Sequence, residues 1–100
     1  MALHVEVDRN AVADFCRRWR ATELSLFGSV LHDGFTPESD VDVLVRFADD
    51  AGWSLWDLVD MREELKALFG REVDLVEEGG LRNPFRRHRI LASREILYAA

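Results

Sequence analysis

The segment from residue 40 to residue 47 constrains the fold most, because it predicts a β-strand with two unlike faces. Its residues are Asp40-Val41-Asp42-Val43-Leu44-Val45-Arg46-Phe47. Most of these have high β-propensity, and successive side chains of a strand point to opposite faces. The two aspartates therefore project together while the three valines face the other way. We expect a sheet that buries the valine side of this strand.

Local start and stop signals predict five further elements. Asp8 is a favoured helix N-cap, Gly70 is a helix C-terminal stop, and Asn83-Pro84 is an N-cap followed by proline at the first helical position. The expected elements are a helix over 9–20, strands over 22–27 and 40–47, a helix over 54–69, a strand over 71–77 and a helix over 84–98. The order α-β-β-α-β-α predicts an α/β or α+β sheet with helices packed on it. The positions of the last two helices expected to face the core are Leu55, Leu58, Val59, Leu65, Leu68, Phe69, Phe85, Ile90, Leu91 and Leu97.

The chain of 100 residues predicts one domain, 1–100, with a small core. A domain of this size buries only about 60 to 65% of its unfolded surface, so a deep pocket would be completed by a ligand or a partner chain. Its composition, 48% hydrophobic and 32% charged, is typical of a soluble globular domain. No apolar run approaches a membrane span, and the first residues resemble no signal peptide, so we expect a cytoplasmic protein with no membrane partner. The single cysteine, Cys16, excludes an internal disulfide and is expected in the core.

Charge is distributed unevenly along the chain. Its 13 basic and 19 acidic residues give a net charge of −6. The segment 82–94 contains five arginines and no acid, which leaves eight basic against nineteen acidic residues elsewhere. Three interpretations of this segment are open: a solvated helix face, a contact with a partner, or a contact with phosphate. The four arginines concerned are Arg82, Arg86, Arg87 and Arg89.

Asp40 and Asp42 are candidate ligands of a magnesium ion. Two ionised carboxylates spaced about 6.8 Å apart along one face of a strand repel each other unless a cation lies between them. Magnesium usually takes one or two carboxylates and completes its coordination with water and substrate phosphates. Acids are also common at strand ends, so an Asp-x-Asp pattern is weak evidence by itself.

The pair Gly28-Ser29 follows the strand over 22–27 and strengthens the magnesium hypothesis. A sharp turn at Gly28 would present free backbone N–H groups and the Ser29 hydroxyl, an arrangement that holds phosphate oxygens. A turn glycine followed by an ordinary helix cap is the alternative for these two residues.

Asp74 interrupts the apolar run of the strand over 71–77 and is the third candidate. A carboxylate buried there would cost several kcal/mol without a cation or a hydrogen-bonding partner. If its strand lies beside that of Asp40 and Asp42, Asp74 becomes a third carboxylate of a two-metal site, or a base for the attacking hydroxyl. The alternative is an acid on an edge strand that faces water.

These motifs together resemble the nucleotidyltransferases of the DNA polymerase beta superfamily, and specifically the minimal nucleotidyltransferase (MNT) proteins, the antitoxin partners of HEPN-domain toxins. The resemblance covers nearly the whole chain. It implies a short mixed β-sheet flanked by helices, with Asp40, Asp42 and Asp74 as metal-binding and catalytic carboxylates and Gly28 and Ser29 as the phosphate loop. It further implies Mg²⁺, two ions, as cofactor and ATP as substrate.

By the same resemblance, the chain is expected to transfer AMP to a hydroxyl, that of a tyrosine, on a HEPN ribonuclease toxin. A homodimer or a hetero-oligomer with the toxin is expected, and direct nucleic-acid binding is not. One departure concerns His32, which stands where family members commonly carry arginine. It leaves open a non-catalytic antitoxin that neutralises by stoichiometric binding; nucleotidyl transfer to a small molecule is a third alternative.

Overall fold

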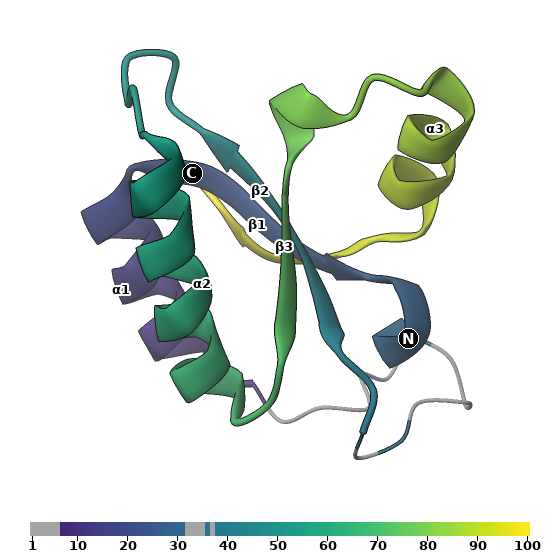
Figure 1. The fold of residues 1–100 in the computed structure, drawn as a ribbon, viewed down its shortest axis with the longest axis horizontal. Coiled ribbons are helices and arrows are strands. Elements are labelled where there is room, and N and C mark those ends of the chain that lie inside the picture. The colour runs from purple at the N-terminus through teal and green to yellow at the C-terminus, as the bar shows by residue number, and fades with distance from the viewer. Residues whose placement is uncertain (1–6, 32–35, 37) are drawn as a thin grey trace.

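The computed structural model describes residues 7–31, 36 and 38–100, and its elements follow the expected order up to the last helix (Figure 1). His32 lies outside the described residues, so its predicted role stays a prediction. The helices, strands and 3-10 turns are α1 (Arg9–Trp19), β1 (Ala21–Phe27), η1 (Gly28–Leu31), β2 (Val41–Phe47), α2 (Leu55–Phe69), β3 (Val73–Glu77), η2 (Glu78–Gly80), α3 (Pro84–Ser93) and β4 (Glu95–Ala99).

The four strands form one mixed sheet in the order β3-β2-β1-β4. β1 pairs antiparallel with β2 on one side and with β4 on the other, whereas β3 runs parallel to β2 at the edge. The parallel pair requires a crossover connection, which α2 provides. The predicted short mixed sheet flanked by helices is therefore confirmed.

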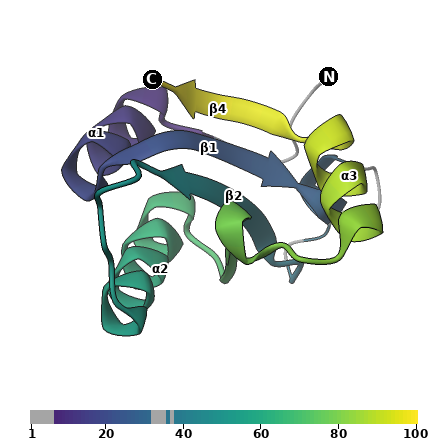
Figure 2. The same cartoon turned by 90° about the horizontal axis from the view of Figure 1, so that it is seen from above.

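Helices α1 and α2 lie together over one face of the sheet (Figures 1 and 2). As expected from the alternation in the sequence, Val41, Val43 and Val45 are buried there together with Phe15 and Cys16 of α1. Asp8 caps the start of α1, and a reciprocal Ser54–Asp57 capping box starts α2. This face contains most of the described core.

Helix α3 lies over the opposite face, at the other end of the sheet from α1 and α2 (Figures 1 and 2). A smaller buried cluster joins it to the strands; this cluster contains Phe27 of β1, Leu44 of β2, Leu81 and Ile90. Because α3 covers only part of this face, Asp42 of β2 stays half-buried and Asp74 of β3 stays exposed. None of the described helices is long and apolar enough to cross a bilayer.

Two expectations about the C-terminal third and α2 were wrong. The last helix ends at Ser93 rather than near Tyr98, and Glu95–Ala99 forms β4, which pairs with β1 and buries Leu97. Leu55 (74% exposed), Val59 and Phe85 (81% exposed), all expected to face the core, lie on the surface instead. The spacing of apolar residues predicts which side of a helix is apolar. It does not predict how much of that side the sheet covers, because the strands come from parts of the chain distant in sequence.

Candidate active site

Asp42 is at the centre of the predicted site. It is the second residue of β2, half-buried, and on the face opposite the three buried valines. In the sheet register its Cα faces that of Phe27 on β1 and that of Asp74 on β3. The sheet therefore brings Asp42 next to both the end of the first strand and the third candidate acid.

Gly28 lies against the Asp42 carboxylate. Its backbone is left-handed, with φ of 74°, and it opens the 3-10 turn η1 directly after β1. A Cβ at this position would clash with Oδ2 of Asp42 and lie 3.2 Å from its Cγ. Only glycine meets both requirements without strain. The adjacent Ser29 is half-buried, and its hydroxyl has no hydrogen-bond partner among the described residues.

Asp40 precedes β2 and is exposed, and its position is braced by a residue that the sequence did not single out. Arg71 Nη1 donates hydrogen bonds to the carbonyl oxygens of Thr36 at 3.0 Å and Ser39 at 3.3 Å. The Ser39 amide in turn donates to the Thr36 carbonyl at 3.0 Å. Arg71, two residues before β3, thus holds the backbone at Ser39, directly before Asp40, and only the tertiary fold shows this contact.

Asp74 is the second residue of β3, and its side chain is exposed. Its strand does lie beside that of Asp42, which was the condition set for a three-carboxylate site. The strand is at the edge of the sheet rather than inside it, so no burial cost has to be offset there. Asp42 is instead the member of the three that is partly withdrawn from water.

The electrostatics of the site converge on Asp42. Burial raises the pKa of the Asp42 carboxyl, and the nearby carboxylates of Asp74 and Asp40 raise it further. The Arg86 guanidinium on α3 acts in the opposite direction and lowers it. The ionised form of Asp42 is thus disfavoured by its surroundings in the absence of a cation, and one arginine of the basic segment is close enough to influence it.

The donor chemistry of these acids fits a hard divalent cation, which takes oxygen ligands. A cation beside Asp42 would offset the repulsion that its two neighbouring carboxylates exert. Among residues 7–31, 36 and 38–100, no group of three or more acid, histidine or cysteine side chains is close enough together to hold a metal ion. The assignment of Asp40, Asp42 and Asp74 as ligands of two ions therefore stays a prediction.

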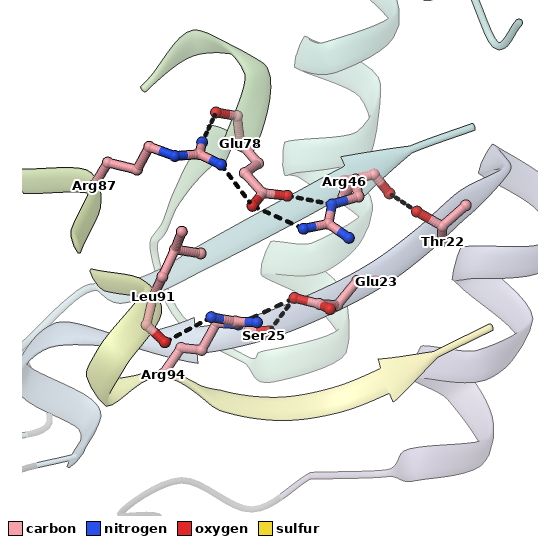
Figure 3. Close-up of polar contacts among 8 residues, drawn as sticks. All are labelled: Thr22, Glu23, Ser25, Arg46, Glu78, Arg87, Leu91 and Arg94. Atoms are coloured by element: carbon pink, nitrogen blue, oxygen red, sulfur yellow. Dashed lines mark hydrogen bonds and ion pairs between the residues drawn. The ribbon is translucent and has the colours of Figure 1, made fainter. Parts of the chain in front are cut away.

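The same face of the sheet carries an ionic network further along the strands (Figure 3). Glu78 of η2 is only 4% exposed, and its carboxylate accepts hydrogen bonds from the Arg46 guanidinium and pairs with Arg87 at 3.5 Å. Arg94 donates from Nε to Glu23 at 3.1 Å and from Nη1 to the Leu91 carbonyl. The hydrogen bond from Arg46 keeps the pKa of the Glu78 carboxyl low despite its burial. This network fixes α3 to the sheet.

Comparison with known proteins identifies the family to which this site belongs. The model of the nucleotidyltransferase domain family matches residues 9–97. The chain belongs to the nucleotidyltransferase domain family. This nucleotidyltransferase is 33% identical over 81 residues to the protein adenylyltransferase MntA of Thermococcus cleftensis, which corresponds to 81% of the present chain and 77% of the relative.

Solved structures share the fold of the nucleotidyltransferase. One that carries the name minimal nucleotidyltransferase is 36% identical, with a TM-score of 0.72 over 87% of this chain and 86% of the other. Another, a tri-AMPylated HEPN toxin of Shewanella oneidensis in complex with an MNT antitoxin, has a TM-score of 0.63 at 20% identity and covers 92% and 70% of the two chains. The predicted resemblance to minimal nucleotidyltransferases, and nucleotidyltransferase activity, are thus confirmed.

Proposed function

We propose that this nucleotidyltransferase is a magnesium-dependent antitoxin that transfers AMP from ATP to a tyrosine hydroxyl of a partner HEPN ribonuclease toxin. The observation that carries the proposal is the placement of Asp42, which has Gly28 against its carboxylate and Asp74 beside it in register. The name of the MntA relative, a protein adenylyltransferase, supports AMP transfer to protein. The AMPylated toxin found with an MNT antitoxin supports the class of partner.

Each predicted residue has a chemical role in this proposal. Backbone N–H groups at Gly28 and the Ser29 hydroxyl bind phosphate oxygens, and Asp40 and Asp42 provide oxygen ligands for magnesium. Bound magnesium neutralises phosphate charge and favours attack on phosphorus. Asp74, exposed at the edge of the sheet, is free to orient the acceptor hydroxyl or take its proton.

The transfer of AMP is a single displacement at the α-phosphorus of ATP. The acceptor oxygen forms a new bond to that phosphorus, and the bond to the oxygen that bridges to the β-phosphorus breaks. Pyrophosphate leaves with the electron pair of the broken bond, and the hydroxyl proton passes to Asp74 or to water. Asp74 lies on an open edge strand, so a protein acceptor can approach it without a second domain of this chain.

Intact mass spectrometry of the candidate toxin tests the proposal. The toxin is incubated with ATP, Mg²⁺ and the wild-type chain, or with Asp40→Ala, Asp42→Ala or the control Asp60→Asn. Asp60 is an exposed acid on α2, over the opposite face of the sheet. We expect mass increments of AMP with the wild type and with Asp60→Asn, and none with the two site variants. Absence of any increment with the wild type would contradict the proposal.

A stoichiometric antitoxin is the second candidate, and exposed apolar side chains on α2 favour it. Leu55 and Trp56 at the start of that helix are exposed, Trp56 by 78%, together with Val59 one turn later. A surface of this kind suits a protein contact. Toxin neutralisation that persists in Asp42→Ala, with no mass change in any sample, would establish this second function.

A further inference from the structure

Four of the five arginines of the basic segment fall into two groups in the structure, and Arg82 is exposed and forms no ion pair with a described carboxylate. Arg87 and Arg94 are held in ion pairs with Glu78 and Glu23, so their charges serve the packing of α3. Arg86 and Arg89 are exposed, and neither forms an ion pair with a described carboxylate. Two unpaired guanidinium groups three residues apart on one side of a short helix favour an anion between them.

Arg86 and Arg89 lie beside the predicted phosphate loop. A hollow of about 290 Å³ is lined by Phe27, Gly28, Arg86, Arg89, Ile90 and Ser93. Gly28 therefore has the Asp42 carboxylate near it and also borders the hollow with the two arginines. The hollow lies on the side of α3 that carries residues 86, 89 and 93, one helical face. A ligand at Gly28 would meet both guanidinium groups.

A second, larger hollow does not compete for this role. It has a volume of about 490 Å³ and includes Arg46, Glu78 and Arg87 in its lining. Those three charges already satisfy one another in the ionic network of Figure 3. This hollow borders Arg46, which is four residues from Asp42 along β2, a separation of about 13 Å. It therefore lies away from the predicted site.

We propose that Arg86 and Arg89 bind the β- and γ-phosphates of the nucleoside triphosphate, and so the pyrophosphate that leaves. This inference rests on the proposed function, because it concerns the triphosphate of the same reaction. The planar fork of arginine matches two phosphate oxygens, and its charge offsets the negative charge that grows on the departing group. The ion pairs of Arg87 and Arg94 hold α3 in the position that this contact needs.

A binding experiment with uncleavable nucleotides tests the assignment. The protein with Mg²⁺ is titrated with α,β-methylene-ATP, whose α–β bridge cannot be broken by transfer, and separately with AMP, which lacks the β- and γ-phosphates. The chains compared are the wild type, Arg86→Gln, Arg89→Gln and the double variant. Arg17→Gln is the matched control, because Arg17 is an exposed arginine of α1 on the other face of the sheet. Thermal unfolding of every variant confirms that it is folded.

We expect each single substitution to weaken binding of the triphosphate analogue by about tenfold and the double substitution by more, while AMP binding changes less than about twofold. Arg17→Gln is expected to change neither. Unchanged affinity for the analogue in the double variant, or an equal loss for AMP, would overturn the assignment. A change found only in the KM for the protein acceptor, in assays of AMP transfer, would also overturn it, because it would make these arginines a partner contact.

The proposed function is judged separately, on the wild type alone. If the wild type transfers AMP and binds the analogue but the arginine variants bind it equally well, only the arginine assignment fails. If the wild type binds neither nucleotide, the proposed function fails and the arginine assignment fails with it.

Discussion

The two faces of the sheet differ in what holds them together. Beneath α1 and α2, buried apolar side chains from every strand pack against both helices. On the opposite face the described residues form a smaller buried cluster beneath α3, with an ionic network beside it. In so small a chain, one face of the sheet therefore provides most of the stability, which leaves the other free to carry unfavourable charge.

Strand β2 shows this division within a single element. Its residues that face α1 and α2 are Val41, Val43 and Val45, all fully buried. Its residues on the opposite face are Asp42, Leu44 and Arg46, which belong in turn to the predicted site, the small cluster and the ionic network. Substitutions on each face of the sheet test this division.

Removal of the Phe15 ring tests the apolar face. Phe15 is fully buried in α1 with its ring centroid 6.5 Å from that of Trp19. We expect Phe15→Ala to lower the free energy of unfolding by about 3 to 5 kcal/mol, because it removes buried area and leaves a cavity. Urea denaturation followed by tryptophan fluorescence measures it. A loss below about 1 kcal/mol would show that stability does not reside mainly on this face.

Neutralising Glu78 tests the ionic network on the other face. We expect Glu78→Gln to lower the free energy of unfolding at pH 7 by about 2 kcal/mol, because Arg46 and Arg87 lose a charged acceptor. The folded-state pKa of Glu78 lies below its ordinary value of 4.5, so its stabilisation is present above pH 4.5 and is lost as pH falls through the folded-state pKa. Unfolding curves of both proteins across this range should therefore converge in acid. A pH-independent difference would contradict the charge argument.

Adding a methyl group at Gly28 tests the contact between the phosphate loop and Asp42. We expect Gly28→Ala to cost about 1 to 2 kcal/mol, because alanine is strained at a φ of 74° and its Cβ would clash with the Asp42 carboxylate. Gly70→Ala is the matched control, since its φ of 70° is similar but a Cβ there meets nothing within 4 Å. Thermal unfolding compares the two. Equal tolerance of both substitutions would mean that the close contact at Gly28 is not a constraint.

Neutralising Asp42 is expected to have the smallest effect on stability and the opposite sign. The folded-state pKa of Asp42 is raised above its ordinary value of 3.8, so its ionisation destabilises the fold as pH rises above 3.8 through that raised pKa. Asp42→Asn should therefore unfold at a slightly higher temperature than the wild type at pH 7. Millimolar Mg²⁺ should raise the unfolding temperature of the wild type but not of the variant. A less stable variant at pH 7 would contradict the assignment of unfavourable charge.

Much of the fold could be predicted because its signals are local. The caps at Asp8 and Asn83 and the alternation of β2 each depend on neighbours a few residues away. β4 could not be predicted, because its pairing with β1 joins residues about 70 positions apart and Leu97 also fits a helical stripe. Exposure of Phe85 depends likewise on how little of the sheet α3 covers.

The candidate site also has a part that could be predicted from the sequence and a part that could not. The sequence singled out Gly28, Asp42 and Asp74 but left open whether the strand of Asp74 lies beside that of Asp42, and the register shows that it does. The hydrogen bonds from Arg71 to the backbone before Asp40 had no signal in the sequence, because the acceptors are the carbonyl oxygens of Thr36 and Ser39. Neither could the sequence separate the paired Arg87 from the unpaired Arg86, which lie next to each other in the chain and on different sides of α3.

Measurement of AMP transfer and stability on the same sample of Asp42→Asn tests the central claim most directly. The claim is that the face around Asp42 performs nucleotidyl transfer and that the opposite face provides the stability to tolerate its charge. We predict that the variant at pH 7 is at least as stable as the wild type and transfers AMP to the toxin at least about 100-fold more slowly. Transfer at the wild-type rate by the folded variant would contradict the claim.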